Sequence, residues 1–302
     1  MAAKQVTERG LVMIDLASAL LCCLSLSALL SSAEKLESSL TILKEVNLRG
    51  PYLGLITVYP PEEDAFFDTG AFKPHQKHPY VDLSGRRFRV GKMGKKKVIY
   101  VRCGVGMVNA AAATQQMLDM FDKPNATIPA GDFTELDFGA YSEPSRGYNQ
   151  LGSIGYSTEQ FFSKWGKPNT AQRKLWFHVS KNWLELANTR LEGMVLEQCV
   201  NSSSCLTQRP KLVVGLSGAT ADIFLDNAAY GEFLYKTFQV SSVDMESVAV
   251  VMTSLSNGFP VIVIRGLSDQ AGAQEGQNPI DLFGPLAASN AAKAVVQFVK
   301  AL

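Results

Sequence analysis

Residues 98–115 read VIYVRCGVGMVNAAAATQ, and they carry in succession the patterns of a strand, a glycine turn and a helix. The run Lys97–Cys103 is apolar and rich in β-branched residues, which is typical of a strand buried on both faces. Glycines follow it, and Val108–Phe121 then has the alanine-rich composition and spacing of a helix. This stretch therefore predicts one strand–turn–helix unit of an α/β protein.

The same patterns recur on both sides of this unit. We expect further strands over Tyr52–Tyr59, Lys211–Leu216, Phe238–Val243 and Pro260–Arg265, and helices over Ala171–Ala187, Glu246–Leu255 and Leu282–Leu302. Residues 85–101 have the glycine spacing of an antiparallel excursion. Strands that alternate with helices predict a single α/β domain over residues 51–302, with a mixed, mostly parallel sheet flanked by helices.

Composition and charge exclude several classes of partner. The 302-residue chain is 46% hydrophobic and 19% charged, and its formal net charge is +1, so it has no general attraction to nucleic acid. The Arg and Lys cluster within residues 86–97 is interrupted by glycines and is interpreted as a solvated hairpin rather than a phosphate patch. The histidines and cysteines lack H-E-x-x-H and C-x-x-C spacing, so we predict neither a metal site nor a cofactor.

The N-terminus has the pattern of a signal peptide. Lys4 and Arg9 precede the apolar stretch Leu11–Ala33, which ends in the small residues Ser31-Ser32-Ala33. We expect residues 1–33 to be cleaved and residues 34–50 to form a short helix or linker. A retained anchor and a buried helix are the alternatives, and Asp15 argues against a stable membrane span. The chain would then enter the secretory pathway and become extracellular or vacuolar.

An oxidising compartment would also affect the cysteines. Cys199 and Cys205 bracket the polar loop VNSSS, which a disulfide could close, and two unpaired surface thiols are the alternative. Asn125-Ala126-Thr127 and Asn201-Ser202-Ser203 are glycosylation sequons, which have meaning for a secreted chain.

Chemistry-bearing residues follow the expected strands, where ligands of open α/β sheets bind. These strand ends carry Glu62 and Glu63, Gly104-Val105-Gly106, Ser217–Phe224, Met245-Glu246 and Ser268-Asp269. Each has a structural interpretation when taken singly: Glu246 as a helix N-terminal carboxylate, Asp269 as a cap, and the glycines as a tight turn.

Taken together and in this order, these stretches resemble the nucleoside phosphorylase/nucleosidase superfamily. The resemblance runs from about Leu53 to Leu302 and rests on GLITVYPPEE (54–63), residues 98–115, VVGLSGATADIF (213–224), VSSVDMESVAV (240–250) and PVIVIRGLSDQAG (260–272). The D-M-E and R-G-L-S-D pair is its most specific part. Within the superfamily the chain resembles plant bark storage and wound-inducible proteins most, which also share the secretory start and the CVNSSSC loop.

The resemblance implies cleavage of the N-glycosidic bond of a purine nucleoside or of methylthioadenosine, by phosphate or water, through a cation-like sugar. It makes Asp269, next to Ser268, the acid that protonates the leaving base. Glu246 would accept hydrogen bonds from the ribose hydroxyls, and Met245 would pack under the sugar. Phe224 and Leu225 would line the base. It also implies a homo-oligomer.

The group that activates the attacking molecule stays open. Glu62 and Glu63 are both candidates for the base, with an exposed acidic turn as the alternative. The backbone N–H groups of Gly104, Val105 and Gly106 would hold phosphate or water. Arg102 would help if its side chain faces the anion, although on a strand it could equally point to the other face.

One departure from the superfamily weakens the expectation of activity. Members follow the glycine-loop helix with a central strand that ends in G-x-A-G, whereas here Phe121 runs directly into Asp122-Lys123-Pro124-Asn125. A family segment near residues 122–127 is therefore missing, and residues 122–168 contain no predicted core element. A storage or wound-response protein with little catalysis is the alternative function, and a nucleoside- or cytokinin-binding module is a third.

Overall fold

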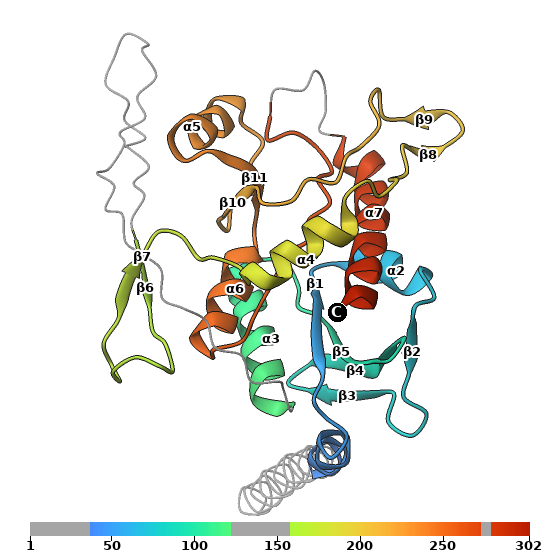
Figure 1. Cartoon of the computed structure of the whole chain (residues 1–302), viewed down its shortest axis with the longest axis vertical. Coiled ribbons are helices and arrows are strands. Elements are labelled where there is room, and N and C mark those ends of the chain that lie inside the picture. The colour runs from blue at the N-terminus through green and yellow to red at the C-terminus, as the bar shows by residue number, and fades with distance from the viewer. Residues whose placement is uncertain (1–36, 122–157, 273–278) are drawn as a thin grey trace, which may run out of the picture.

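The computed structural model describes residues 37–121, 158–272 and 279–302 (Figure 1). A mixed sheet flanked by helices confirms the predicted α/β class. The signal peptide, the sequon at Asn125 and the family segment missing near residues 122–127 concern parts of the chain outside these residues. Among the described helices, none is long and apolar enough to cross a membrane.

The main sheet has the order β1-β5-β4-β2, with β3 paired to β4. Its strands are β1 (Leu53–Thr57), β2 (Phe72–Pro74), β3 (Tyr80–Leu83), β4 (Arg86–Met93) and β5 (Lys96–Arg102). β1 and β5 are parallel, whereas β2, β3 and β5 each pair with β4 antiparallel. The antiparallel share is larger than predicted because β4 pairs antiparallel with three strands, β2, β3 and β5. The basic cluster lies in its β4–β5 hairpin, with exposed lysines around the turn, as expected of a solvated hairpin.

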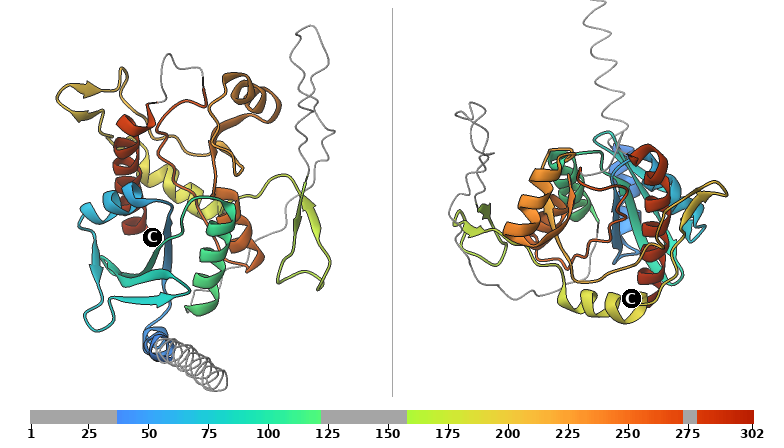
Figure 2. Two further views of the ribbon diagram at one scale, coloured as in Figure 1. Left: turned by 180° about the vertical axis from the view of Figure 1, so that it is seen from behind. Right: turned by 90° about the horizontal axis from the view of Figure 1, so that it is seen from above.

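Six helices have defined bounds in the described residues: α2 (Pro60–Asp68), α3 (Met107–Met120), α4 (Lys181–Leu191), α5 (Ala228–Phe238), α6 (Ser247–Ser256) and α7 (Ile280–Ala301). α3 and α6 lie side by side on one face of β5, and α2 and α7 lie on the other (Figures 1 and 2). Ile99 and Val101 of β5 pack with α3, while Val98 and Tyr100 pack with α2 and α7. This alternation confirms that β5 is buried on both faces.

Three small two-stranded sheets complete the described residues. They are β6 (Glu159–Phe161) with β7 (Gln172–Lys174), β8 (Cys199–Asn201) with β9 (Ser204–Cys205), and β10 (Ser217–Thr220) with β11 (Val240–Asp244). β10 and β11 are parallel and lie apart from the main sheet (Figure 1). Before β1, residues 37–47 form a helix, and Leu43 and Val46 of this helix are buried in the core. The segment expected to be a short helix or linker therefore packs onto the domain.

Three sequence predictions of secondary structure were wrong. Lys211–Leu216 and Pro260–Arg265 form neither strand nor helix, because their backbones find no strand to pair with in the described residues. Their apolar side chains are nevertheless partly buried, since Val214 and Ile264 pack in one cluster with α4 and α7. The helix predicted over Ala171–Ala187 begins at Lys181, because Ser180 caps it by accepting a hydrogen bond from the Trp183 N–H at 3.4 Å.

One edge of β1 has no strand partner among the described residues. β5 pairs with the other edge, and β10–β11 forms a separate parallel sheet. A cavity of 1210 Å³ follows the whole of β1, and its opposite wall includes residues 259–271. β11 also lines this cavity, so the cavity lies between β1 and the parallel β10–β11 pair.

Candidate active site

Arg265 contacts three carboxylates, two from the turn after β11 and one from the start of α2. Its Nε donates to Asp244 Oδ2 at 3.1 Å, and its Nη2 donates to Glu246 Oε2 at 3.0 Å. Its Nη1 lies 3.7 Å from Glu62 Oε1. The strand end at β11, the start of α2 and the segment after residue 260 therefore meet at one guanidinium. Sequence analysis missed Arg265 as a site residue, although a single basic residue ending the apolar run PVIVIR was a signal.

Asp244 positions the turn between β11 and α6. Its Oδ1 accepts hydrogen bonds from the N–H groups of Glu246 at 3.0 Å and Ser247 at 2.8 Å, and from Thr220 Oγ1 at 2.8 Å. Burial raises the pKa of Asp244, but the Arg265 charge and the hydrogen bonds from Ser247 outweigh it and hold the pKa below its usual value. Asp244 therefore remains a carboxylate that fixes both Arg265 and the backbone of Glu246.

Glu246 is buried, with 5% of its surface exposed, at the N-terminal end of α6. Besides the contact with Arg265, its Oε1 accepts from the Gly106 N–H at 2.9 Å. The carboxylate thus joins the glycine loop after β5 to the D-M-E turn after β11. Glu246 is therefore both the residue at the N-terminal end of α6 and a residue of the candidate site.

The structure separates the two neighbouring glutamates at the start of α2. Glu62 lines the cavity, and its Oε2 accepts from the Val58 N–H at 2.7 Å. Burial raises the pKa of Glu62, with the Glu246 charge adding to this effect and the hydrogen bond from Val58 and the Arg265 charge opposing it. Glu63 does not line the cavity and pairs instead with Arg102 at 2.9 Å and Arg89 at 3.3 Å. Both carboxylates belong to helix α2, so the exposed acidic turn was the wrong alternative.

Arg102 faces Glu63 rather than the cavity. It follows the buried Val101 on β5, and successive residues of a strand point to opposite faces. The expectation that Arg102 could help to hold an anion therefore has no geometric support.

The glycine loop turns its N–H groups toward protein acceptors. The φ angles are 92° at Gly104 and 97° at Gly106, a range in which side chains are strained. Gly104 N–H donates to the Val58 carbonyl at 3.0 Å, and Gly106 N–H donates to Glu246. The next residue, Met107, donates its N–H to Asp222 Oδ1 at 2.7 Å. Val105 reaches the cavity wall, and Asp222 is a further contact of the loop that sequence analysis missed.

The remaining predicted residues share the cavity with Glu62 and Glu246. Met245, Phe224, Leu225, Ser268 and Asp269 all line it. Ser268 Oγ donates to Asp269 Oδ1. Burial raises the pKa of Tyr59, and the charges of Glu62 and Asp269 add to this effect, so the Tyr59 hydroxyl lies within the fields of both carboxylates. Residues from several of the predicted motifs therefore line one cavity.

The comparison with protein families agrees with this geometry. Residues 52–131 and 141–300 match the phosphorylase superfamily. The chain belongs to this superfamily. It is 30% identical to bark storage protein A of Populus deltoides, in an alignment that covers 83% of this chain and 88% of that protein. It is 25% identical to the 5'-methylthioadenosine/S-adenosylhomocysteine nucleosidase of Listeria monocytogenes, over 74% of this chain and 89% of that enzyme.

Solved structures of superfamily members share the fold. A mutant form of the Helicobacter pylori nucleosidase, with 5'-methylthioadenosine in its active site, superposes with a TM-score of 0.54 at 18% identity. The superposition covers 84% of this chain and all of that one. The Streptococcus pneumoniae nucleosidase, solved with a transition-state inhibitor, gives the same TM-score at 19% identity, covering 83% of this chain and 99% of that one.

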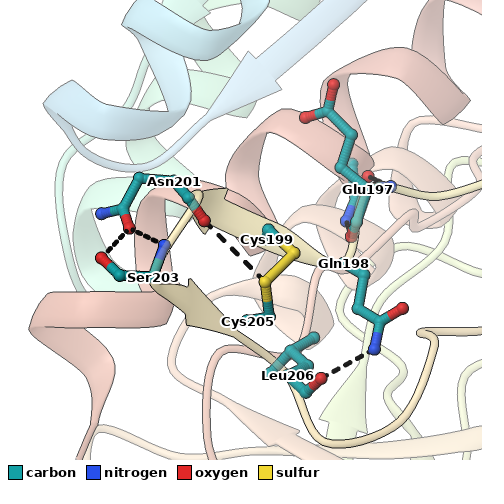
Figure 3. Close-up of a disulfide and its surroundings, with 8 residues drawn as sticks. Glu197, Gln198, Cys199, Asn201, Ser203, Cys205 and Leu206 are labelled. Atoms are coloured by element: carbon teal, nitrogen blue, oxygen red, sulfur yellow. Dashed lines mark hydrogen bonds between the residues drawn. A yellow bond between two sulfur atoms is a disulfide. The ribbon is translucent and has the colours of Figure 1, made fainter.

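The disulfide predicted between Cys199 and Cys205 is present, and it closes the β8–β9 hairpin (Figure 3). Asn201 lies exposed in this hairpin, and its Oδ1 accepts from both the N–H and the Oγ of Ser203 at 2.9 Å. Cys103 is the free cysteine of the described residues, and it is buried at the end of β5. Burial, with the Glu246 charge adding to it, raises the pKa of the Cys103 thiol to about 12, so the thiol remains protonated.

Acidic groups do not gather into a metal site in the part of the chain that the structure describes. No cluster of three or more His, Cys, Asp or Glu side chains there has an arrangement that could hold a metal ion. The carboxylates of the site are instead held by Arg265 and by backbone N–H groups.

Proposed function

We propose that this chain cleaves the N-glycosidic bond of a purine nucleoside or of a methylthioadenosine-type substrate, with water or phosphate as the second substrate. One observation carries the proposal: Glu62, Glu246 and Asp269 line one cavity, and Arg265 bridges the first two. The named activity of the nucleosidase relatives supports the same reaction class. The reaction needs no cofactor.

Glu246 binds the sugar in this proposal. Each carboxylate oxygen can accept more than one hydrogen bond, so the bonds from Gly106 and Arg265 leave acceptor capacity for two ribose hydroxyls. A buried, fixed negative charge beside the sugar also favours the positive charge that develops when the base leaves. Met245, the preceding residue, packs under the sugar.

Asp269 protonates the leaving base, and Ser268 orients its carboxyl group through their hydrogen bond. Phe224 and Leu225 supply the apolar wall against which the planar base stacks. Phe224 is 55% exposed, so it stands at the rim of the cavity, where a bound base would cover it.

Glu62 activates the attacking molecule by taking its proton. A general base works best when its pKa approaches the working pH, and burial shifts the pKa of Glu62 in that direction. Arg265 contacts both Glu62 and Glu246, and Asp244 holds Arg265 in place. We therefore assign Arg265 and Asp244 as positioning residues.

The oligomeric state and the cellular location are further parts of this proposal. The chain assembles as a homo-oligomer, as the superfamily resemblance implies. The apolar N-terminus directs it into the secretory pathway, and the bark storage relatives support an extracellular or vacuolar destination.

Release of free base from adenosine, inosine and methylthioadenosine tests the reaction. The assay compares this chain with a restored chain, in which the corresponding segment of bark storage protein A is inserted between Phe121 and Asp122. In the more active of the two, Asp269→Asn should lower turnover by about 10²–10⁴-fold, the scale of lost acid catalysis. Glu246→Gln should impair both KM and kcat, whereas Asp226→Asn, a matched change outside the cavity lining, should leave both near the parent values. Equal rates for all variants would contradict the assignment of the site.

Storage with little catalysis is the second candidate function. The open edge of β1 and the similarity to bark storage proteins favour it. Base release from the restored chain, with none from the natural chain, would support storage by a fold that once carried the reaction.

A further inference from the structure

Two N–H groups at the start of α3, those of Gly106 and Met107, are already bound to carboxylates. A helix N-terminus with a glycine loop normally attracts phosphate, because its N–H groups and dipole both favour an anion. Here Gly106 donates to the buried carboxylate of Glu246 at 2.9 Å, and Met107 donates to Asp222 at 2.7 Å. Gly104 donates to the Val58 carbonyl. An incoming phosphate would have to displace these acceptors, two of which carry negative charge.

The charges of the cavity wall add to this effect. Arg265 is the single Lys, Arg or His among the described residues that line the cavity, and the carboxylates on the same wall are Glu62, Glu232, Asp244, Glu246 and Asp269. Arg265 contacts three of these carboxylates already. Phosphate sites in proteins usually offer Arg or Lys side chains that are free to pair with the anion, and among the described residues this cavity offers only Arg265, which is already paired.

We infer that the glycine loop, blocked by Asp222 and Glu246, excludes phosphate, so that water is the attacking molecule and the reaction is a hydrolysis. This inference rests on the proposed function. Asp222 is then a residue that determines the second substrate, although it does not touch the reacting atoms.

The hydrolytic step balances without phosphate. The bond between the anomeric carbon and the base nitrogen breaks, and its electron pair leaves with the base, which takes a proton from Asp269. The water oxygen forms the new bond to the anomeric carbon, and one water proton passes to Glu62. The products are the free base and a reducing sugar, and the proton gained by Glu62 replaces the one lost by Asp269 through solvent.

Titration of this chain with inorganic phosphate, followed by ³¹P NMR, tests the exclusion directly. The natural chain should leave the phosphate signal unchanged. Asp222→Ala frees the Met107 N–H and removes a charge, and it should raise phosphate affinity by at least about tenfold, equivalent to about 1.4 kcal/mol. Asp222→Asn keeps an acceptor for that N–H and should raise phosphate affinity less. Asp226→Asn, in the same connection between β10 and α5, controls for the loss of one charge and should leave phosphate affinity unchanged.

Product analysis in ¹⁸O-labelled water, with phosphate present, provides the second arm. A free sugar that carries one ¹⁸O atom supports hydrolysis. A sugar 1-phosphate, or phosphate binding by the natural chain, overturns the inference while leaving the proposed cleavage intact. If no nucleoside releases its base, the proposed function fails, and the phosphate titration of the same protein still decides whether the loop excludes the anion.

Discussion

Glu62 and Glu63 are adjacent in the sequence, yet their environments make them chemically different. α2 directs Glu62 toward Arg265 and the cavity, whereas Glu63 pairs with Arg102 of β5 and Arg89 of β4. Successive residues of a helix point about 100° apart, so one side chain alone can face the site. Sequence analysis could place a base here but could not choose between them, because the choice depends on which face of α2 packs on β1.

Replacement of each glutamate by glutamine distinguishes them. Glu62→Gln should lower turnover by about 10²–10⁴-fold, because the base is lost while shape is kept. Glu63→Gln removes partly exposed ion pairs and should change turnover little and stability by about 1 kcal/mol or less. The measurement is kcat in the restored chain, beside thermal melts of both variants. A larger kinetic loss in Glu63→Gln would reverse the assignment.

The pH dependence of kcat/KM should report the environment of Glu62. A base must be ionised to accept a proton, and burial raises the pKa of Glu62 above the usual 4.5. Activity should therefore fall as the pH drops through this raised pKa, so that the acid limb of the profile lies above pH 4.5. Glu63→Gln should leave this limb in place. A profile that remains flat down to pH 4.5 would exclude Glu62 as the titrating base.

At the scale of elements, local patterns located the main strands and helices but missed α2, α5 and β10, and they could not show which apolar runs would find a strand to pair with. β1, β5, β11, α3, α6 and α7 were all predicted within a few residues. Lys211–Leu216 and Pro260–Arg265 have equally good strand patterns, but a strand also needs a neighbour, and hydrogen bonding between strands is not a local property of the sequence. The same limit applies to Arg265 and Asp222, whose partners come from other elements.

The β8–β9 hairpin gives a prediction that belongs to one element. Its disulfide closes a loop with a sequence separation of 6, so the chain-entropy contribution to the free energy of unfolding should be about 2 kcal/mol. The double variant Cys199→Ser, Cys205→Ser should therefore melt at a lower temperature but keep its base release, because neither residue lines the cavity. Non-reducing peptide mapping checks the pairing, and alkylation of both thiols without reduction would show that it does not form.

At the scale of the whole molecule, the 1210 Å³ cavity exceeds the roughly 300–1,000 Å³ that is typical of small-molecule sites. Its walls include the full length of β1 and the apolar residues Val261 to Ile264, besides the carboxylates at the strand ends. Parallel strands are normally paired on both sides and covered on both faces. In the described residues the site therefore lies in a cavity between the edge strand β1 of the main sheet and the separate β10–β11 sheet.

Restoring a strand in this cavity should improve both stability and catalysis. An inserted strand would pair with β1 and cover the apolar wall opposite, and its burial would contribute several kcal/mol, about 0.8 kcal/mol for each CH₂ group removed from water. That is a large share of a typical unfolding free energy of about 5–15 kcal/mol. Neighbouring strands sit about 4.8 Å apart, so an inserted strand would act as a spacer that fixes the distance between Glu62 and Asp269. Rates fall steeply when reacting groups are displaced by about 1 Å.

The test is a side-by-side thermal melt and base-release assay of the natural and restored chains. The restored chain should melt higher and release base at least about tenfold faster, since each ~1.36 kcal/mol of barrier gives that factor. A third chain, with a Gly/Ser-rich insert of equal length at the same position, controls for the added loop and should gain neither property, because such a segment has no apolar side chains to bury. If the natural and restored chains melt together and react at equal rates, the cavity beside β1 does not limit the enzyme, and the distance between Glu62 and Asp269 must be fixed by Arg265 and the elements already in place.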